Sequence, residues 1–215
     1  MRTVPIAALL LLLAAVAPAA ELVLAPVAAG DDARLACEGD LDFLAGTSST
    51  AAQLQVGGTA YGCDREWAAS CEFDLGPVPA DLDLLSAVFT VRKTGYADDA
   101  QGLFYLGLFT YPASGAPTAV PRDDLDPQTA LGVVWLTAVN GDLSFDVTEP
   151  VERVLGDPGA RLGLLLAGVY SEAGYEDWIT IGGAAHAQPP RLTLTYAGAV
   201  GNEPRTWSEV KALYR

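Results

Sequence analysis

The chain has 215 residues, of which 51% are hydrophobic, and its 12 Lys and Arg against 27 Asp and Glu give a formal charge of −15. Such a surface repels phosphate backbones and anionic lipid, which argues against nucleic-acid binding. The acidic residues are spread through turns, as in Asp31-Asp32 and Asp123-Asp124, rather than gathered in a tail. Most of them are therefore interpreted as the solvated surface of an extracellular protein.

The first residues, MRTVPIAALLLLLAAVAPAA, have the layout of a secretory signal peptide. Arg2 precedes an apolar run from Val4 to Val16, and Ala17-Pro18-Ala19 supplies the small-x-small pattern of a cleavage site. The run is shorter than the ~20 apolar residues that cross a bilayer. We therefore predict removal of residues 1–19, a secreted protein in the medium or at the cell surface, and no membrane span afterwards. An uncleaved anchor is the alternative.

Beyond residue 19 the chain shows almost no helical periodicity. Short apolar or alternating runs are separated by Gly, Pro and Asp clusters, which predicts an all-β module over residues 20–197, an antiparallel two-sheet β-sandwich with a jelly-roll-like fold. Strands are expected near Glu21–Val27, Ala33–Glu38, Gln53–Val56, Ser70–Leu75, Ser86–Lys93, Leu103–Thr110, Leu131–Thr137, Leu143–Val147, Arg161–Tyr170, Trp178–Ile181 and Arg191–Tyr196. Residues 131–136 and 162–169 are apolar on both phases of the alternation, so both are expected in the middle of packed sheets.

One short helix is predicted near residues 149–156. Thr148 is expected to cap it, Pro150 suits the first turn, and Gly156 stops the run. The buried stripe of this helix would consist of Val151, Val154 and Leu155.

Residues 198–215 are predicted to be a linker followed by a short amphipathic helix. Thr206 and Glu209 have the spacing of a capping box, and Trp207 begins an apolar stripe at helical spacing. This tail is basic on an otherwise acidic protein. Either it docks its apolar stripe on the domain, or it is an exposed tag that export or surface-attachment machinery recognises.

Three cysteines follow the signal peptide, so an oxidising compartment allows one disulfide and one free thiol. Cys63 and Cys71 flank a short loop and could pin a hairpin. Cys71 also shares its alternation phase with Phe73, and Cys37 shares its phase with Leu35, so these two cysteines could meet in the core instead. We predict the Cys63–Cys71 bridge, with Cys37–Cys71 as the alternative.

Six short motifs follow one another along the chain. They are Asp32-Ala33-Arg34-Leu35, Leu54-Gln55-Val56-Gly57, Cys71-Glu72-Phe73-Asp74-Leu75, Leu85-Ser86-Ala87-Val88-Phe89, Phe145-Asp146-Val147-Thr148 and Pro190-Arg191-Leu192-Thr193-Leu194-Thr195-Tyr196. Their order, over residues 31–196, resembles the DNRLRE domains, which include the family 96 carbohydrate-binding modules, although the hexapeptide that names the family is missing. The resemblance implies a bacterial secreted jelly-roll-like module, usually non-catalytic, attached to enzymes or cell-surface proteins.

The chain offers few residues for catalysis. His186, the single histidine, lies in a Gly/Pro-rich segment without a nucleophile elbow, so we expect a loop histidine rather than a catalytic base. One histidine also excludes the several His ligands of cupin-type metal chemistry. No short motif in the sequence marks two acidic residues as the carboxylate pair that glycoside hydrolysis needs. The sequence therefore predicts a protein that is not an enzyme, with a glycan hydrolase as the least favoured alternative.

Several segments combine aromatic rings with carboxylates, as sugar-binding and calcium-binding sites do. Sugar hydroxyls need acceptors and sugar ring faces need aromatic platforms. The candidate ligand-binding residues are Tyr175, Trp178, Tyr96 and Trp67, and the candidate ligands of a structural calcium are Glu172, Glu176, Asp177, Asp98 and Asp99. No other cofactor is expected. Plain strand-connecting turns are the alternative for each segment.

The leading hypothesis from the sequence is a secreted, non-catalytic module that binds a polysaccharide or cell-surface glycan, or that mediates adhesion at the cell surface. The alternative is a structural protein of an extracellular or envelope assembly that uses its tail for sorting or attachment.

Overall fold

The computed structural model describes residues 19–35, 42–59, 65–79, 83–98, 105–121, 124–125, 128–135, 139–170 and 176–197. The rest of the predicted signal peptide, Cys37, Cys63 and the tail 198–215 lie outside these ranges. No helix within them is long and apolar enough to cross a membrane.

The described chain is mostly antiparallel β-structure with one helix, which confirms the predicted fold class. The elements are β1 (Ala19–Leu24), β2 (Ala28–Leu35), β3 (Phe43–Ala45), β4 (Gln53–Thr59), β5 (Arg65–Asp74), β6 (Leu84–Asp98), β7 (Tyr105–Tyr111), β8 (Thr118–Val120), β9 (Gly132–Trp135), β10 (Gly141–Asp146), α1 (Thr148–Val154), β11 (Arg161–Tyr170), β12 (Glu176–Gly182) and β13 (Arg191–Ala197). Eleven strands form one curled sheet, and β3 pairs with β8 in a second, small sheet.

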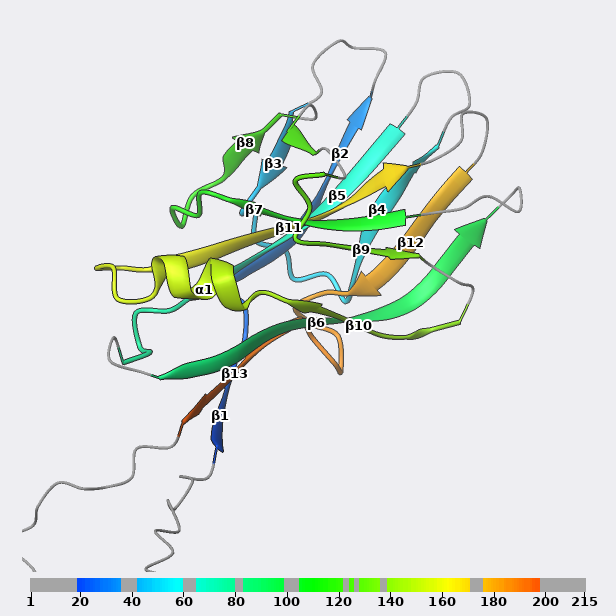
Figure 1. Cartoon of the computed structure of the whole chain (residues 1–215). Coiled ribbons are helices and arrows are strands. Elements are labelled where there is room, and N and C mark those ends of the chain that lie inside the picture. The colour runs from blue at the N-terminus through cyan, green and yellow to red at the C-terminus, as the bar shows by residue number, and fades with distance from the viewer. Residues whose placement is uncertain are drawn as a thin grey trace, which may run out of the picture.

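The large sheet folds over on itself because two strands each share one edge between two neighbours. β6 pairs with β13 along its first part and with β12 along its second, while β10 occupies the opposite edge. β5 pairs in the same way with β4 and then β11, opposite β2. The β12–β4 pair therefore joins a lower layer, β1-β13-β6-β10, to an upper layer, β2-β5-β11-β7-β9 (Figure 1).

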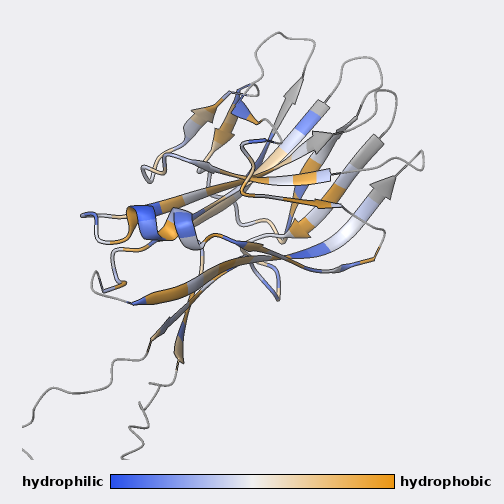
Figure 2. Ribbon diagram, viewed as in Figure 1, coloured by the Kyte–Doolittle hydropathy of each residue, from blue (hydrophilic) through white to orange (hydrophobic). Residues whose placement is uncertain are grey.

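The main core fills the space between these two layers. Alternate residues of each strand point into it, and Figure 2 shows the resulting apolar stripes along β6, β10 and β11. Phe73 meets Phe89 edge-on with ring centroids 5.8 Å apart, and Phe89 stacks on Phe145 at 6.4 Å. Aromatic pairs of this kind stabilise a core beyond the area that they bury.

A second core lies on the outer face of the upper layer. The small β3–β8 sheet covers β5, β7 and β11 there, so that Phe43 and Val120 pack against Phe109, Tyr111 and Leu165. This covering explains why residues on both faces of β5 and β11 are buried.

Helix α1 is shorter than predicted, although its buried face is the expected one. Val151 is fully buried, and Val154 and Leu155 pack against the main core. The predicted cap was wrong, because Val147 occupies the N-cap position without a side-chain cap. The Thr148 hydroxyl instead donates to Asp146 Oδ1 and accepts from the Ala87 N–H, which ties the helix to β6.

Of the two strands expected in the middle of sheets, β11 lies there and β9 does not. β11 lies between β5 and β7, and Leu162–Ala167 are all buried, as predicted. β9 instead forms the end of the sheet order and pairs only with β7 in the part of the chain that the structure describes. Its apolar residues are therefore half exposed rather than buried on both faces.

The two ends of the module lie side by side, because β1 pairs with β13 (Figure 1). Ala19, the last residue of the predicted signal peptide, is already the first residue of β1 and pairs with Ala197. The described sheet thus begins at Ala19 and ends at Ala197.

Candidate functional site

Two of the predicted ligand-binding residues lie on either side of one glycine. The register pairs Gly57 of β4 with Trp178 of β12 on one side and with Trp67 of β5 on the other. Directly paired residues project to the same side of a sheet, so the two partly buried tryptophans stand two strand spacings apart, roughly 10 Å. Gly57 has a φ of 128°, a conformation that favours glycine, so no side chain fills the gap.

The predicted loop aromatic Tyr96 is a strand residue. β6 continues to Asp98, and Tyr96 is partly buried against the main core, with the Lys93 ammonium 5.2 Å from its ring centroid. Lys93 is itself buried, donates to the Val139 carbonyl oxygen at 2.8 Å, and has its pKa lowered by that burial. Tyr96 therefore contributes packing rather than the exposed loop platform that the sequence suggested.

The predicted calcium ligands lie at the ends of β6 and β12 or outside the residues that the structure describes. Asp177 of β12 pairs with Asp98 of β6, so the register brings these two predicted calcium ligands opposite each other, and Glu176 pairs with Thr59. Tyr175, Glu172 and Asp99 lie outside the described ranges. Among the residues described, no group of three His, Cys, Asp or Glu is placed to hold a metal ion.

Cys71 is a free thiol in the structure, while Cys63 and Cys37, the two partners considered for its disulfide, lie outside the described residues. Cys71 shares the inward phase of Phe73, as expected, and its side chain is enclosed by the main core. This burial raises the pKa of the Cys71 thiol to about 12.

An exposed aromatic pair that the sequence did not single out stands at one end of β9. Trp135 is 49% exposed, and Tyr105 on β7 meets it edge-on at 5.1 Å between ring centroids. The two residues are directly paired in the β7–β9 register, and Tyr105 is paired in turn with Tyr170 of β11. The Tyr105 ring thus packs nearly perpendicular to the indole, and about half of the Trp135 side chain stays exposed.

The pair continues into an apolar strip along the edge strand. Val133 and Leu131, on the same side of β9 as Trp135, are 44% and 36% exposed. Near Leu131 a groove of about 480 Å³ opens between β7 and the segment around β8. Its floor includes Phe109, Tyr111 and Leu125, and its rim includes Thr110, Asp124 and Thr129.

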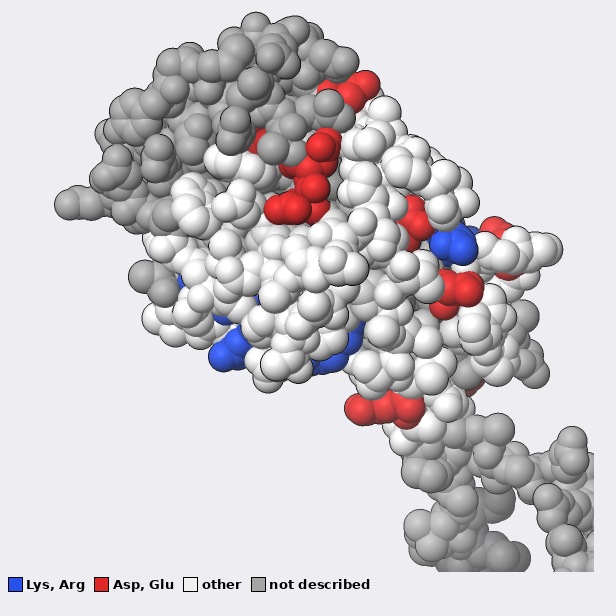
Figure 3. Space-filling model, turned by 180° about the vertical axis from the view of Figure 1, so that it is seen from behind, with Lys and Arg blue, Asp and Glu red and all other residues white. Residues whose placement is uncertain are grey.

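Charged side chains form separate groups rather than one patch. Seen from behind, Asp and Glu occupy several places on the surface with only a few Lys and Arg (Figure 3). One group spans three strands of the lower layer, where Asp142 accepts hydrogen bonds from Arg191 at 3.1 Å and Arg92 at 3.2 Å. These two hydrogen bonds hold the pKa of Asp142 below its ordinary value, and the bond from Arg191 is the larger cause.

His186 lies in the turn before β13, where its Nδ1 accepts from the Gln188 N–H at 3.0 Å.

No protein-family model matches this chain, and no curated protein matches it. Among solved structures it is similar to the CBM22-1 xylan-binding domain of Xyn10C from Paenibacillus barcinonensis. The two are 10% identical, the match covers 80% of this chain and 92% of that domain, and the TM-score is 0.30. A likeness at this level carries no argument about the ligand of this chain.

Proposed function

We propose that the protein is a non-catalytic carbohydrate-binding module whose ligand lies on the Trp135–Tyr105 pair. The observation that carries the proposal is the half-exposed Trp135 indole, braced by Tyr105 on a rigid strand pair. A pyranose ring has an apolar face, and stacking that face on an indole buries apolar area for both partners. A sheet that fixes the indole in advance lowers the entropy lost on binding.

The polar groups needed to orient a sugar lie in the groove lined by the far end of β7 and the segment that precedes β9. The groove beyond Leu131 presents Thr110, Asp124 and Thr129 at its rim. From Trp135 to Thr129 the chain spans six residues, at most roughly 20 Å because only residues 132–135 are a strand. The ligand would therefore be a chain of several sugar units lying along the edge of the sheet, with one unit on Trp135.

Two expectations from the sequence support this function, namely secretion and the resemblance to DNRLRE domains. The acids Asp98 and Asp177, opposite each other in the register, support a structural calcium nearby as a further part of the proposal. Calcium would then bind as a structural ion, and chelation would lower the melting temperature without involving Trp135.

Affinity gel electrophoresis against soluble xylan, mixed-linkage β-glucan, galactomannan and pectin tests the proposal. Wild-type protein should be retarded by at least one of them, and Trp135→Ala should abolish the retardation because it removes the stacking face. Val23→Ala is the matched control, since Val23 is 57% exposed at the opposite end of the molecule. Equal retardation of wild type and Trp135→Ala would contradict the assignment of this surface.

A second function is favoured by the same strip. An edge strand with exposed apolar side chains is a template for pairing with another chain, and β9 exposes Val133 and Trp135, next to the exposed Leu131 that precedes it. This observation supports the structural-assembly alternative, in which β9 pairs with a protein partner and the tail serves attachment. Concentration-dependent oligomers that Val133→Lys abolishes, together with no retardation in any gel, would favour assembly over glycan binding.

A further inference from the structure

A pocket of about 370 Å³ opens between α1 and the adjoining ends of β7 and β11. Small-molecule sites typically span ~300–1,000 Å³, so the size is within their range. The apolar walls are Pro112, Pro150, Val154 and Leu162, and two arginines, Arg153 and Arg161, also line it. The pocket lies at the opposite end of β7 from Tyr105, roughly 20 Å along the strand, and it shares Thr110, Tyr111 and Pro112 with the groove assigned to the far end of the glycan.

The Arg161 guanidinium is held in place but its hydrogen-bond donors are unused. It forms an ion pair with Glu72, with Nη1 3.6 Å from Oε2, which is too long for a hydrogen bond. Within the residues that the structure describes, it makes no hydrogen bond. Gly115, at a φ of +76°, packs over the guanidinium, and a Cβ there would lie 3.0 Å from its Cζ atom. The Arg161 side chain is 33% exposed.

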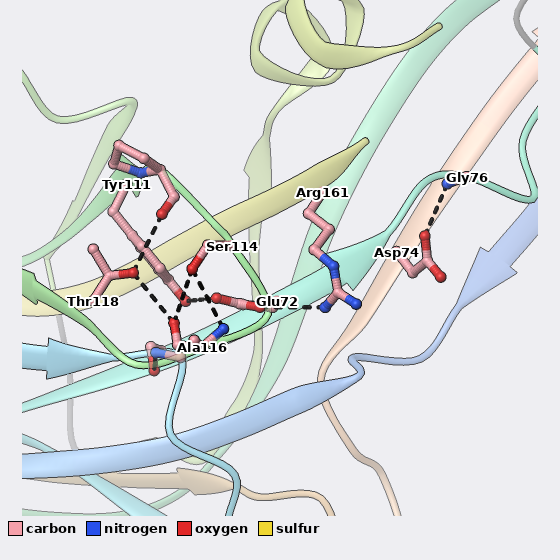
Figure 4. A network of polar contacts seen from close by, with 11 residues as sticks. Glu72, Asp74, Gly76, Tyr111, Ser114, Ala116, Thr118 and Arg161 are labelled. Carbon is pink, nitrogen blue, oxygen red and sulfur yellow. Dashed lines mark hydrogen bonds and ion pairs between the residues drawn. The ribbon is translucent and has the colours of Figure 1, made fainter. Parts of the chain in front are cut away.

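Glu72 fixes this arginine from behind. Its carboxylate is fully buried, accepts a hydrogen bond from the Tyr111 hydroxyl at 3.3 Å, and faces Arg161 with its other oxygen (Figure 4). That second oxygen, Oε2, has no hydrogen-bond partner in the described part of the chain. A buried carboxylate needs a nearby cation, so Glu72 holds the guanidinium at the pocket without occupying its donors.

Arg153 supplies a second cation from α1. Its guanidinium bonds Glu149 at 2.9 Å, one helical turn away, and both side chains are largely exposed. An exposed pair of this kind is weak, so Arg153 can turn to a ligand at little cost. Arg92 and Arg191, in contrast, are both committed to Asp142.

We infer that this pocket binds a carboxylate carried on a compact apolar body. The planar guanidinium fork matches a carboxylate with two parallel hydrogen bonds, which an ammonium does not. The apolar walls receive the body of the ligand, while Arg161, and Arg153 after leaving Glu149, bind its charge. A free organic acid and the C-terminal carboxylate of an apolar peptide both have this chemistry.

Titrations of the full chain at constant ionic strength, followed by NMR chemical shifts, test the inference. The probes are benzoate with its neutral isostere benzamide, and N-acetylphenylalanine with its amide. Both acids should shift residues around the pocket, and each neutral partner should bind at least tenfold more weakly. Stronger binding of benzoate would indicate a free acid, and stronger binding of N-acetylphenylalanine would indicate a peptide C-terminus.

Three variants identify the site. Arg161→Lys keeps the charge beside Glu72, so it should fold, yet lose at least tenfold in affinity for both acids. Ala113→Trp fills the pocket without altering any charge and should have the same effect. Arg191→Gln removes an arginine elsewhere and should leave affinity unchanged. Equal binding of acids and amides, no binding of either acid, or unchanged affinity in Ala113→Trp would overturn the inference.

Discussion

Cys71 lies on β5 with its thiol enclosed by Phe73 and its other neighbours in the main core. Only a thiolate is an effective nucleophile, and burial raises the pKa of this thiol to about 12. The alternation of β5 in the sequence was enough to place the side chain inside. The sequence did not indicate that Cys71 is a free thiol.

We therefore expect Cys71 to resist alkylation by iodoacetamide in the native protein at neutral pH and to react fully after unfolding. Peptide mass spectrometry before and after denaturation measures this. A native peptide in which Cys71 is bridged to Cys63 or Cys37 would contradict the free thiol.

The ionisation of Asp142 is expected to make the free energy of unfolding depend on pH. Its pKa is lowered from 3.8 in the folded protein, chiefly by the hydrogen bond from Arg191 and also by that from Arg92. The folded state thus binds the Asp142 proton more weakly than the unfolded state does. The Asp142 carboxylate therefore contributes fully to the free energy of unfolding above pH 3.8, and this contribution is lost as the pH falls through the lower pKa that Asp142 has in the folded protein.

The difference in unfolding free energy between wild type and Asp142→Asn should accordingly be constant from about pH 5 upwards and shrink in more acidic solution. Urea unfolding at a series of pH values measures it. A difference that grows on acidification would show that Asp142 is not held ionised by its two arginines.

At the scale of elements, β9 and β11 show what a hydrophobic pattern does and does not predict. Both segments are apolar on both phases, and β11 is buried on both faces because β5, β7 and the small sheet surround it. β9 has the same pattern but only one neighbour, β7, within the described chain. Strand order depends on pairings between distant segments, which one strand's alternation does not encode.

The small β3–β8 sheet is expected to contribute substantially to stability despite its three-residue strands. Phe43 is 2% exposed in the second core, and truncation of a buried Phe to Ala typically costs about 3–5 kcal/mol. Phe43→Ala should therefore lower the free energy of unfolding by an amount in that range, measured by urea denaturation. Val23→Ala, at an exposed site, should change it by less than ~0.5 kcal/mol. Similar values for both variants would mean that the small sheet is not packed on β5, β7 and β11.

At the scale of the whole molecule, the sequence predicted the all-β class and the short helix that precedes β11. Those features depend on local periodicity and turn residues, which the chain carries throughout. The curl of the large sheet was beyond such reasoning, because it arises where β5 and β6 each divide an edge between two partners.

The candidate site was predictable only in part for the same reason. Aromatic and acidic residues could be selected by type, and the register then brought Trp67 and Trp178 to the two sides of Gly57. Trp135 was passed over because LGVVWL, its surrounding segment, reads as buried. Its exposure follows from the position of β9 at the sheet edge, which becomes visible only once the strands are assembled.

The central claim is that a glycan stacks on Trp135, and the most direct measurement is an NMR titration of the tryptophan indole signals. The chain has four tryptophans, so Trp135 can be assigned with one Trp135→Phe variant. Addition of a hexasaccharide from the polysaccharide that retards the protein should shift the Trp135 signal most strongly, with Val23→Ala behaving as wild type. A shift confined to Trp67 and Trp178, or no indole shift with any oligosaccharide, would contradict the account.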